Sequence, residues 1–127
     1  MTQSKELLLK DLSARLPYNV VMEVTEPGED NVRFRCFLTP GIYSEIMEGE
    51  GHFEYRPYLR PMSSMTEKEF KELKDTWEYL KHRPDVCVPS VTSYDWLNAH
   101  HFDYRGLIEK DLAVAVTKEN NPYEISD

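Results

Sequence analysis

The segment "WLNAHHFDYRG", residues 96–106, holds the densest group of side chains that could do chemistry. A histidine and a carboxylate three residues apart can share a proton or a metal ion when they lie on one face of a helix. The candidate interaction residues in this segment are His100, His101, Asp103, Tyr104 and Arg105.

Metal binding by this segment is disfavoured by helix geometry. Adjacent residues on a helix point about 100° apart, so His100 and His101 cannot readily bind one ion. His100 and Asp103 could share an ion, but zinc sites need three or four ligands. The remaining histidines, His52 and His82, are distant in sequence. We therefore expect no bound metal and no cofactor.

Catalysis by the same residues would need a nucleophile and an oxyanion site, and the sequence has no motif that marks either. We therefore assign no catalytic residue. The favoured interpretation is structural: Trp96 and one histidine pack inward, and Asp103 binds backbone amides at a chain reversal near Gly106. A small hydrolase that uses His100, His101 and Asp103 stays open as an alternative.

A second candidate is the stretch "RFRCF". If Cys36 faces inward as an inert thiol, then Arg33, Arg35 and Phe37 face outward together. A basic and aromatic stripe on a sheet can bind single-stranded nucleic acid. Alternatively, acidic neighbours such as Glu23 could pair with the arginines across a hairpin.

A third candidate is the proline-containing stretch "PYLRPMSS". An exposed Tyr58 and Arg60 would suit a protein contact, because Tyr and Arg are favoured interface anchors. The alternative is a rigid connector in which Arg60 bonds nearby carbonyls. Pro57 and Pro61 cannot donate to a strand ladder, so we expect an edge strand or a crossing loop here.

Composition sets limits on the class of protein. The 127 residues, 40% of them hydrophobic, fit one domain over 1–127, with a polar C-terminal tail from about residue 117 that we expect to fray. A net charge of −8 disfavours binding to duplex nucleic acid. No apolar run approaches a membrane span, and the charged start does not resemble a signal peptide. We therefore expect a cytoplasmic protein with reduced thiols at Cys36 and Cys87.

Hydrophobic periodicity predicts three helices, at residues 4–16, 66–83 and 93–102. The second is the best marked, because Thr66 and Glu69 have the spacing of a capping box. The expected buried stripes are Leu8, Leu9, Leu12 and Leu16 in the first helix, and Phe70, Leu73, Trp77 and Leu80 in the second.

Alternating residues predict strands at 18–24 and 31–38, which should form an antiparallel hairpin. Residues 52–59 and 86–91 also favour strands, and 107–116 should lead from a helical turn into a last strand. The structure of residues 40–56 is otherwise left open, because "IYSEIME" fits a strand or a helical turn. The predicted fold class is α+β: a small bent antiparallel sheet that could close like a barrel, with about three helices.

Three blocks, "KELLLKDLSARLPY", "PYLRPMSSMTEKEF" and "YDWLNAHHFDYRGLIEKDLA", resemble small proteins of gut Bacteroidales and of their prophages and mobile elements. Asp111 departs from the family pattern, which usually has glycine before "LA". That difference puts a left-handed turn at this position in doubt, since Asp tolerates one less readily. The resemblance implies a phage or mobile-element setting in a bacterial cell and brings no established activity or site residues.

We therefore expect a non-enzymatic accessory protein that acts through contacts with a protein partner of unknown identity. Neither duplex nucleic acid nor a membrane is expected as a partner. An alternative is an acidic inhibitor of a nucleic-acid-handling host enzyme, with carboxylates placed where phosphates normally bind. The carboxylates that could do this are Glu45, Glu48, Glu50 and Glu54.

Overall fold

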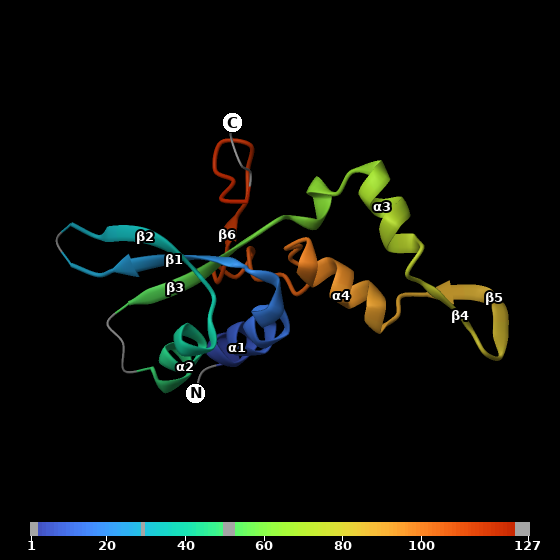
Figure 1. Ribbon diagram of the computed structural model, residues 1–127, viewed down its shortest axis with the longest axis horizontal. Coiled ribbons are helices and arrows are strands. Elements are labelled where there is room, and N and C mark those ends of the chain that lie inside the picture. Colours follow the sequence, from blue (N-terminus) through green and yellow to red (C-terminus); the bar gives the residue numbers. More distant parts are fainter. Residues whose placement is uncertain (1–2, 29, 50–52, 124–127) are drawn as a thin grey trace.

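A four-stranded sheet with strand order β2-β1-β3-β6 forms one end of the molecule (Figure 1). The computed structural model describes residues 3–28, 30–49 and 53–123. Strand β1 pairs antiparallel with β2, as the predicted hairpin requires, and antiparallel with β3 on its other side. The strands are β1 (Val21–Glu26), β2 (Val32–Phe37), β3 (Glu54–Leu59) and β6 (Val114–Ala115).

The α+β prediction is confirmed, but three of its details differ from the structure. Strand β6 runs parallel to β3, so the sheet is mixed rather than antiparallel. The described strands do not close into a barrel, because β2 and β6 are the two unpaired edges of the sheet. The described residues also form four α-helices rather than about three.

Strand β3 lies inside the sheet, so the expectation of an edge strand or crossing loop at Pro57 is wrong. The Leu38 N–H donates to Val20 O at 2.8 Å, so these two residues form a hydrogen-bonded pair. Hydrogen-bonded and non-hydrogen-bonded pairs then alternate along β1 and β2. Met22 therefore directs its backbone groups towards β2, and Pro57 opposite it directs its nitrogen away from β1. Strand β6 pairs only from Tyr58 onward. The missing N–H of Pro57 consequently costs no ladder bond.

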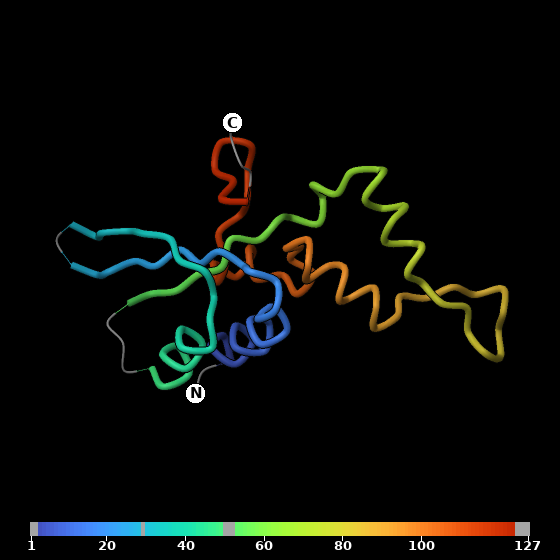
Figure 2. Tube along the Cα trace, in the orientation of Figure 1, coloured from blue at the N-terminus to red at the C-terminus, as the bar shows by residue number. Residues whose placement is uncertain are grey.

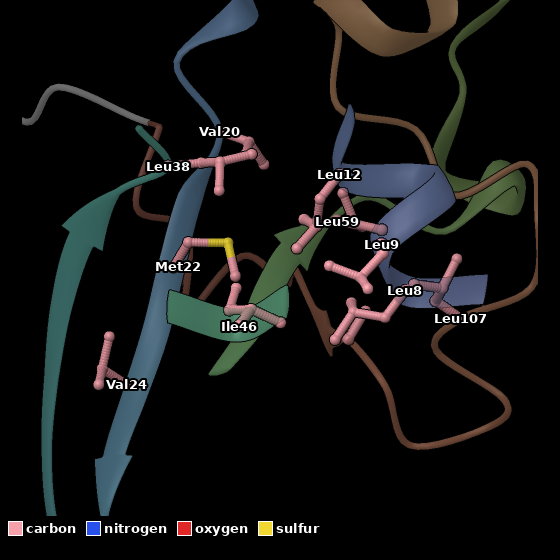
Figure 3. Close-up of a cluster of buried hydrophobic side chains, with 11 residues drawn as sticks. Leu8, Leu9, Leu12, Val20, Met22, Val24, Leu38, Ile46, Leu59 and Leu107 are labelled. Carbon is pink, nitrogen blue, oxygen red and sulfur yellow. The ribbon is translucent and has the colours of Figure 1, made fainter. Parts of the chain in front are cut away.

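Helices α1 (Gln3–Arg15) and α2 (Pro40–Glu48) pack their apolar side chains against one face of the sheet (Figure 3). The first helix is confirmed, and a 3₁₀ turn, η1 (Leu16–Tyr18), follows it. The segment before residue 49, for which the sequence favoured neither a strand nor a helical turn, forms α2. The Thr39 side chain caps this helix by accepting from the Ile42 N–H at 3.1 Å. The buried core comprises Leu8, Leu9, Leu12, Val20, Met22, Val24, Leu38, Ile46, Leu59, Leu107 and Ala113.

An arm extends from the sheet and carries the other two helices (Figure 2). A second 3₁₀ turn, η2 (Met62–Ser64), leads into α3 (Glu67–Lys74). A two-stranded hairpin of β4 (Glu78–Leu80) and β5 (Arg83–Val88) follows, and α4 (Val91–Ala99) returns towards the sheet.

The capping box of α3 is confirmed, but the predicted length of this helix is wrong. Thr66 accepts from the Glu69 N–H at 3.1 Å, and Glu69 accepts from the Thr66 N–H at 3.0 Å. The helix ends at Lys74, because the aromatic and β-branched residues beyond it pair as the β4–β5 hairpin. Only Leu73 of the expected stripe is buried: Phe70 is 47% exposed, Leu80 is exposed and Trp77 is half-buried.

A left-handed turn occurs at Asp111, whose φ is 59°, although the absence of glycine had put it in doubt. The Asp111 N–H donates to Ile108 O at 3.1 Å, and the Leu112 N–H donates to Leu107 O at 2.9 Å. These backbone bonds hold the conformation despite the Cβ atom. The turn then leads into β6, as the sequence predicts for residues 107–116.

Leu12 has no exposed surface and lies in the core between α1 and the sheet. We expect Leu12→Ala to lower the free energy of unfolding by about 2–5 kcal/mol, because it removes buried methyl groups and leaves a cavity. Urea denaturation would measure this. Leu12→Met, which nearly conserves volume, should cost less than about 1.5 kcal/mol. Equal losses in the two variants would contradict the proposed packing.

Candidate functional site

The segment around His100 forms a polar junction between the sheet and the arm. Helix α4 ends at Ala99, and His101 then adopts a left-handed φ of 64°. This reversal lets the chain pair with Arg60: the Arg60 N–H donates to His101 O at 2.7 Å, and the Asp103 N–H donates to Arg60 O at 2.9 Å. The structure thus brings two of the separately predicted candidate stretches together.

Asp103 stabilises a chain reversal, as the structural interpretation predicts. Its two carboxylate oxygens accept from the Leu107 N–H at 2.9 Å and from the Ile108 N–H at 3.0 Å. Gly106 lies within the reversal and has a φ of 76°. The described hydrogen bonds of the Asp103 side chain go to these amides and not to a histidine, so the residue does not form a histidine–carboxylate pair.

The two histidines face different partners, as the metal argument anticipates. His100 stacks on Trp96 with ring centroids 4.0 Å apart, and His101 stacks on Tyr123 at 3.8 Å. The pKa of His101 is lowered to about 4, mainly by burial and in addition by the charges of Arg15, His100 and Arg60. His101 is therefore neutral near pH 7. Within the described ranges, no three His, Cys, Asp or Glu residues are grouped to hold a metal ion.

Arg60 connects the junction to helix α3. Its guanidinium donates two hydrogen bonds to Glu69, at 2.7 and 2.8 Å, and lies over the Phe102 ring at 4.1 Å. The bonds from Arg60 are the main reason that the pKa of Glu69 falls to about 2. The connector interpretation expected Arg60 to bond nearby carbonyls, but its main partner is the Glu69 carboxylate, and the Ser64 carbonyl accepts only at 3.5 Å. The expected exposure of Tyr58 is wrong, since only 3% of its surface is accessible.

A buried ion pair that the sequence reading missed lies at the base of the junction. Arg15 and Asp11 have no exposed side-chain surface, and Arg15 Nε lies 2.7 Å from the Asp11 carboxylate. Arg15 also donates to Phe102 O at 2.7 Å, and Arg105 donates to Asp11 at 2.9 Å. The available signal was the placement of two charges four residues apart on the leucine-rich face of α1.

Tyr104 and Tyr123 complete the junction. The Tyr104 hydroxyl donates to Asn98 at 3.0 Å. The Tyr123 hydroxyl accepts from the Val21 N–H at 2.9 Å and donates to Tyr58 O at 2.7 Å, so it bridges β1 and β3 where their ladder opens. Burial raises the pKa of Tyr123. Asn120 and Tyr123 thus contact the sheet, and the fraying expected from residue 117 stays a prediction.

The predicted basic and aromatic stripe on β2 is present, but one of its arginines is bonded within the chain. Arg33, Arg35 and Phe37 alternate along β2 and share a face. Arg35 donates to the Tyr58 hydroxyl at 3.3 Å and to Asn120. Cys36, on the opposite face, is half-buried, and its burial together with the charge of Glu45 raises its pKa. A high thiol pKa fits the expected inert cysteine.

The acidic residues of the inhibitor alternative are mixed with basic ones. Glu45 accepts from the Tyr55 hydroxyl at 2.7 Å, and burial together with this bond raises the pKa of Tyr55 to about 12. A hollow lined by Glu45 and Glu54 is also lined by Lys5 and Arg56. Glu48 is exposed, while Glu50 and His52 lie outside the described residues.

Comparison of the chain with protein-family models, with curated proteins and with solved structures gave no match. The resemblance to Bacteroidales and mobile-element proteins therefore stays a prediction. Among the described helices, none has both the length and the apolar character that crossing a membrane requires.

The Asp11–Arg15 pair generates a stability prediction. We expect Asp11→Ala to lower the free energy of unfolding by about 3–5 kcal/mol, because it leaves the Arg15 charge buried without its carboxylate. The double variant Asp11→Leu, Arg15→Met removes both charges and should recover much of that loss. Urea denaturation would compare both with Ser13→Ala, an exposed control on the same helix. An Asp11→Ala protein as stable as the control would contradict the role of the pair.

His101 generates a prediction on pH. Its folded pKa of about 4 lies below the ordinary value of 6.5. The unfolded chain therefore takes up a proton that the folded chain does not as the pH falls from about 6.5 to about 4. We expect this stabilising contribution to be complete above that window and to be lost across it. The stabilising contribution of Glu69, whose pKa is lowered from 4.5 to about 2, is lost only as the pH falls below about 4.5.

Urea denaturation at about pH 7.5 and about pH 5 measures the effect, and His101→Asn should reduce the difference between the two values. Asparagine is a suitable control because it tolerates a left-handed backbone. An NMR titration in which the ring of His101 has an ordinary pKa would refute the prediction.

Proposed function

We propose that this chain is a non-enzymatic accessory protein of a phage or mobile element that binds a protein partner in a bacterial cytoplasm. The polar junction supports binding over catalysis, because its side chains stabilise the fold. Asp103 binds two backbone amides, Arg60 binds Glu69, and Arg105 binds Asp11. Such side chains are not available to activate a nucleophile or to position a substrate.

The observation that carries the proposal is an apolar groove along α3. Met62 and Phe70 are exposed on its walls, with Leu73 at its base. Methionine and phenylalanine side chains on an open groove adapt to the apolar face of a partner helix. The helix that forms the groove is held firmly by its capping box and by the Arg60–Glu69 pair. Binding here would therefore not require the wall to fold first.

The rim of the groove defines the chemistry of the partner. Lys71 and Lys74 line it together with one carboxylate, Glu67, so its charge is positive on balance. The Lys74 ammonium lies 5.6 Å from the centroid of the Phe70 ring. An amphipathic partner helix with an apolar stripe and flanking carboxylates would match both the groove and the lysines. Neither the hydrolase nor the acidic inhibitor has a comparable observation in its favour.

Capture of partners from a lysate of bacterial cells that carry the gene would test this proposal. Three immobilised proteins would be compared: the wild type, the groove variant Met62→Ser, Phe70→Ser, and the control Tyr79→Ser, Val91→Ser. The control removes exposed apolar groups of the same arm outside the groove. We expect one protein to be retained by the wild type and the control and lost from the groove variant, because the groove supplies its apolar contacts.

Circular dichroism should show the same folded content in all three proteins. Retention of the same proteins by the groove variant, or no retention above empty resin by the wild type, would refute the proposal.

A further inference from the structure

The outer edge of β2 offers unpaired backbone groups. Because the Leu38 N–H donates to Val20 O, the even-numbered residues of β2 direct their backbone groups towards β1. The N–H and C=O groups of Arg33, Arg35 and Phe37 therefore point outward. Among the described residues, no strand pairs with this side of β2. Figure 1 shows the strand at the margin of the sheet, with no helix or strand on the side away from β1.

The side chains of this edge are unusually apolar for an unpaired strand. Phe37 is 60% exposed on one face, and Val32 and Phe34 are 52% and 46% exposed on the other. The Phe34 ring has an edge-to-face contact with Phe53 at 6.1 Å, which extends the apolar surface. Proteins normally protect edges with prolines, bulges or inward-facing charges, because an open apolar edge pairs with other chains. The β1–β2 register has no shift, and β2 contains no proline.

Charge at the edge points to the chemistry of what pairs there. Arg33 makes no hydrogen bond or ion pair with the residues that the structure describes. Arg35 faces Glu23 across the hairpin but donates only to neutral oxygens, of Tyr58 and Asn120, while the Glu23 carboxylate accepts from Arg56 and from the Tyr58 hydroxyl. Two arginines without a carboxylate partner are notable in a chain of net charge −8. Opposite charges on facing positions of neighbouring strands stabilise a sheet.

We propose that the outer edge of β2 binds an extended acidic segment of a partner protein as an added strand. Backbone groups of Arg33, Arg35 and Phe37 supply the ladder bonds, and the partner places carboxylates opposite the two arginines. On the other face, its alternate residues are apolar and cover Val32 and Phe34. This is strand addition, in which main-chain bonds give affinity and alternate side chains give specificity.

A second copy of this chain fits the edge less well. Antiparallel pairing about a twofold axis keeps each face of the sheet continuous. The registers that overlap most of β2, with Phe34 opposite Phe34 or Arg35 opposite Arg35, then place arginine directly opposite arginine. Like charges in that position destabilise the pair.

Single-stranded nucleic acid also fits less well. It would use the arginines and Phe37 but would leave the outward backbone groups and the Val32–Phe34 face without partners. The net charge of −8 further opposes a polyanion, whereas a short acidic segment needs only two local ion pairs.

This surface is separate from the α3 groove. Figure 1 shows β2 at the far side of the sheet and α3 in the arm, well apart from each other. The proposal of strand addition at β2 is therefore independent of the proposed function. Its test uses defined peptides rather than a captured protein.

Fluorescence anisotropy with a labelled peptide of about eight residues, in which valine and glutamate alternate, would test the proposal on the whole chain. One matched probe is the same peptide with lysine in place of glutamate. Two further probes are glutamate peptides that carry N-methyl groups on alternate residues, either on the residues that face β2 or on those that face away. The last probe is an oligothymidine. We expect the glutamate peptide to bind best. N-methylation in the register that faces β2 should weaken binding by about tenfold or more, because it removes ladder bonds.

Arg33→Glu should weaken binding of the glutamate peptide by about tenfold and strengthen binding of the lysine peptide. Lys110→Glu, an equal charge change at another exposed site, is the control. The N-methyl comparison uses the wild type and so decides the matter even if Arg33→Glu fails to fold. Absence of binding, equal binding of both N-methyl registers, or tighter binding of oligothymidine would overturn the proposal. A stable dimer in sedimentation equilibrium would overturn it as well, because a second copy would then cover the edge.

Discussion

The Arg15–Asp11 pair, buried without any exposed side-chain surface, is the interaction on which the rest of the structure depends. Two charges removed from water stabilise a fold only when their remaining hydrogen-bonding groups are satisfied. Arg105 and the Phe102 carbonyl meet much of that requirement, so α1 is tied to the segment that follows α4. The same segment pairs with Arg60, which binds helix α3 through Glu69. One buried pair thus fixes how the arm leaves the sheet.

The histidine-rich segment takes its shape from this junction. The chain must reverse after α4 to place the Phe102 carbonyl near Arg15, and His101 accomplishes this with a left-handed backbone. Its ring is then enclosed beside cationic groups and against Tyr123. Burial and positive neighbours both oppose protonation, which is why the neutral ring persists well below ordinary histidine pKa values. The histidine-rich segment therefore forms a chain reversal that lies against a buried ion pair.

Features determined by neighbouring residues could be predicted from the sequence. The leucine spacing gave α1, alternation gave the β1–β2 hairpin, and the capping box marked the start of α3. The chain reversal at Asp103 also followed from local turn chemistry. Features determined by distant residues could not be predicted. The burial of Tyr58, the docking of Tyr123 and the end of α3 at Lys74 depend on pairings between segments far apart in the chain.

The same distinction explains where apolar side chains stay exposed. Near the junction, long-range ties bring α1, α4 and β3 together, and the side chains there are buried. Towards the two ends, β2 pairs with β1 alone among the described strands, and Met62 and Phe70 stay exposed along the α3 groove. An unpartnered apolar surface of this kind on a folded domain marks a contact site more often than a packing defect. The junction holds these ends apart, which gives the chain two separate surfaces rather than one continuous one.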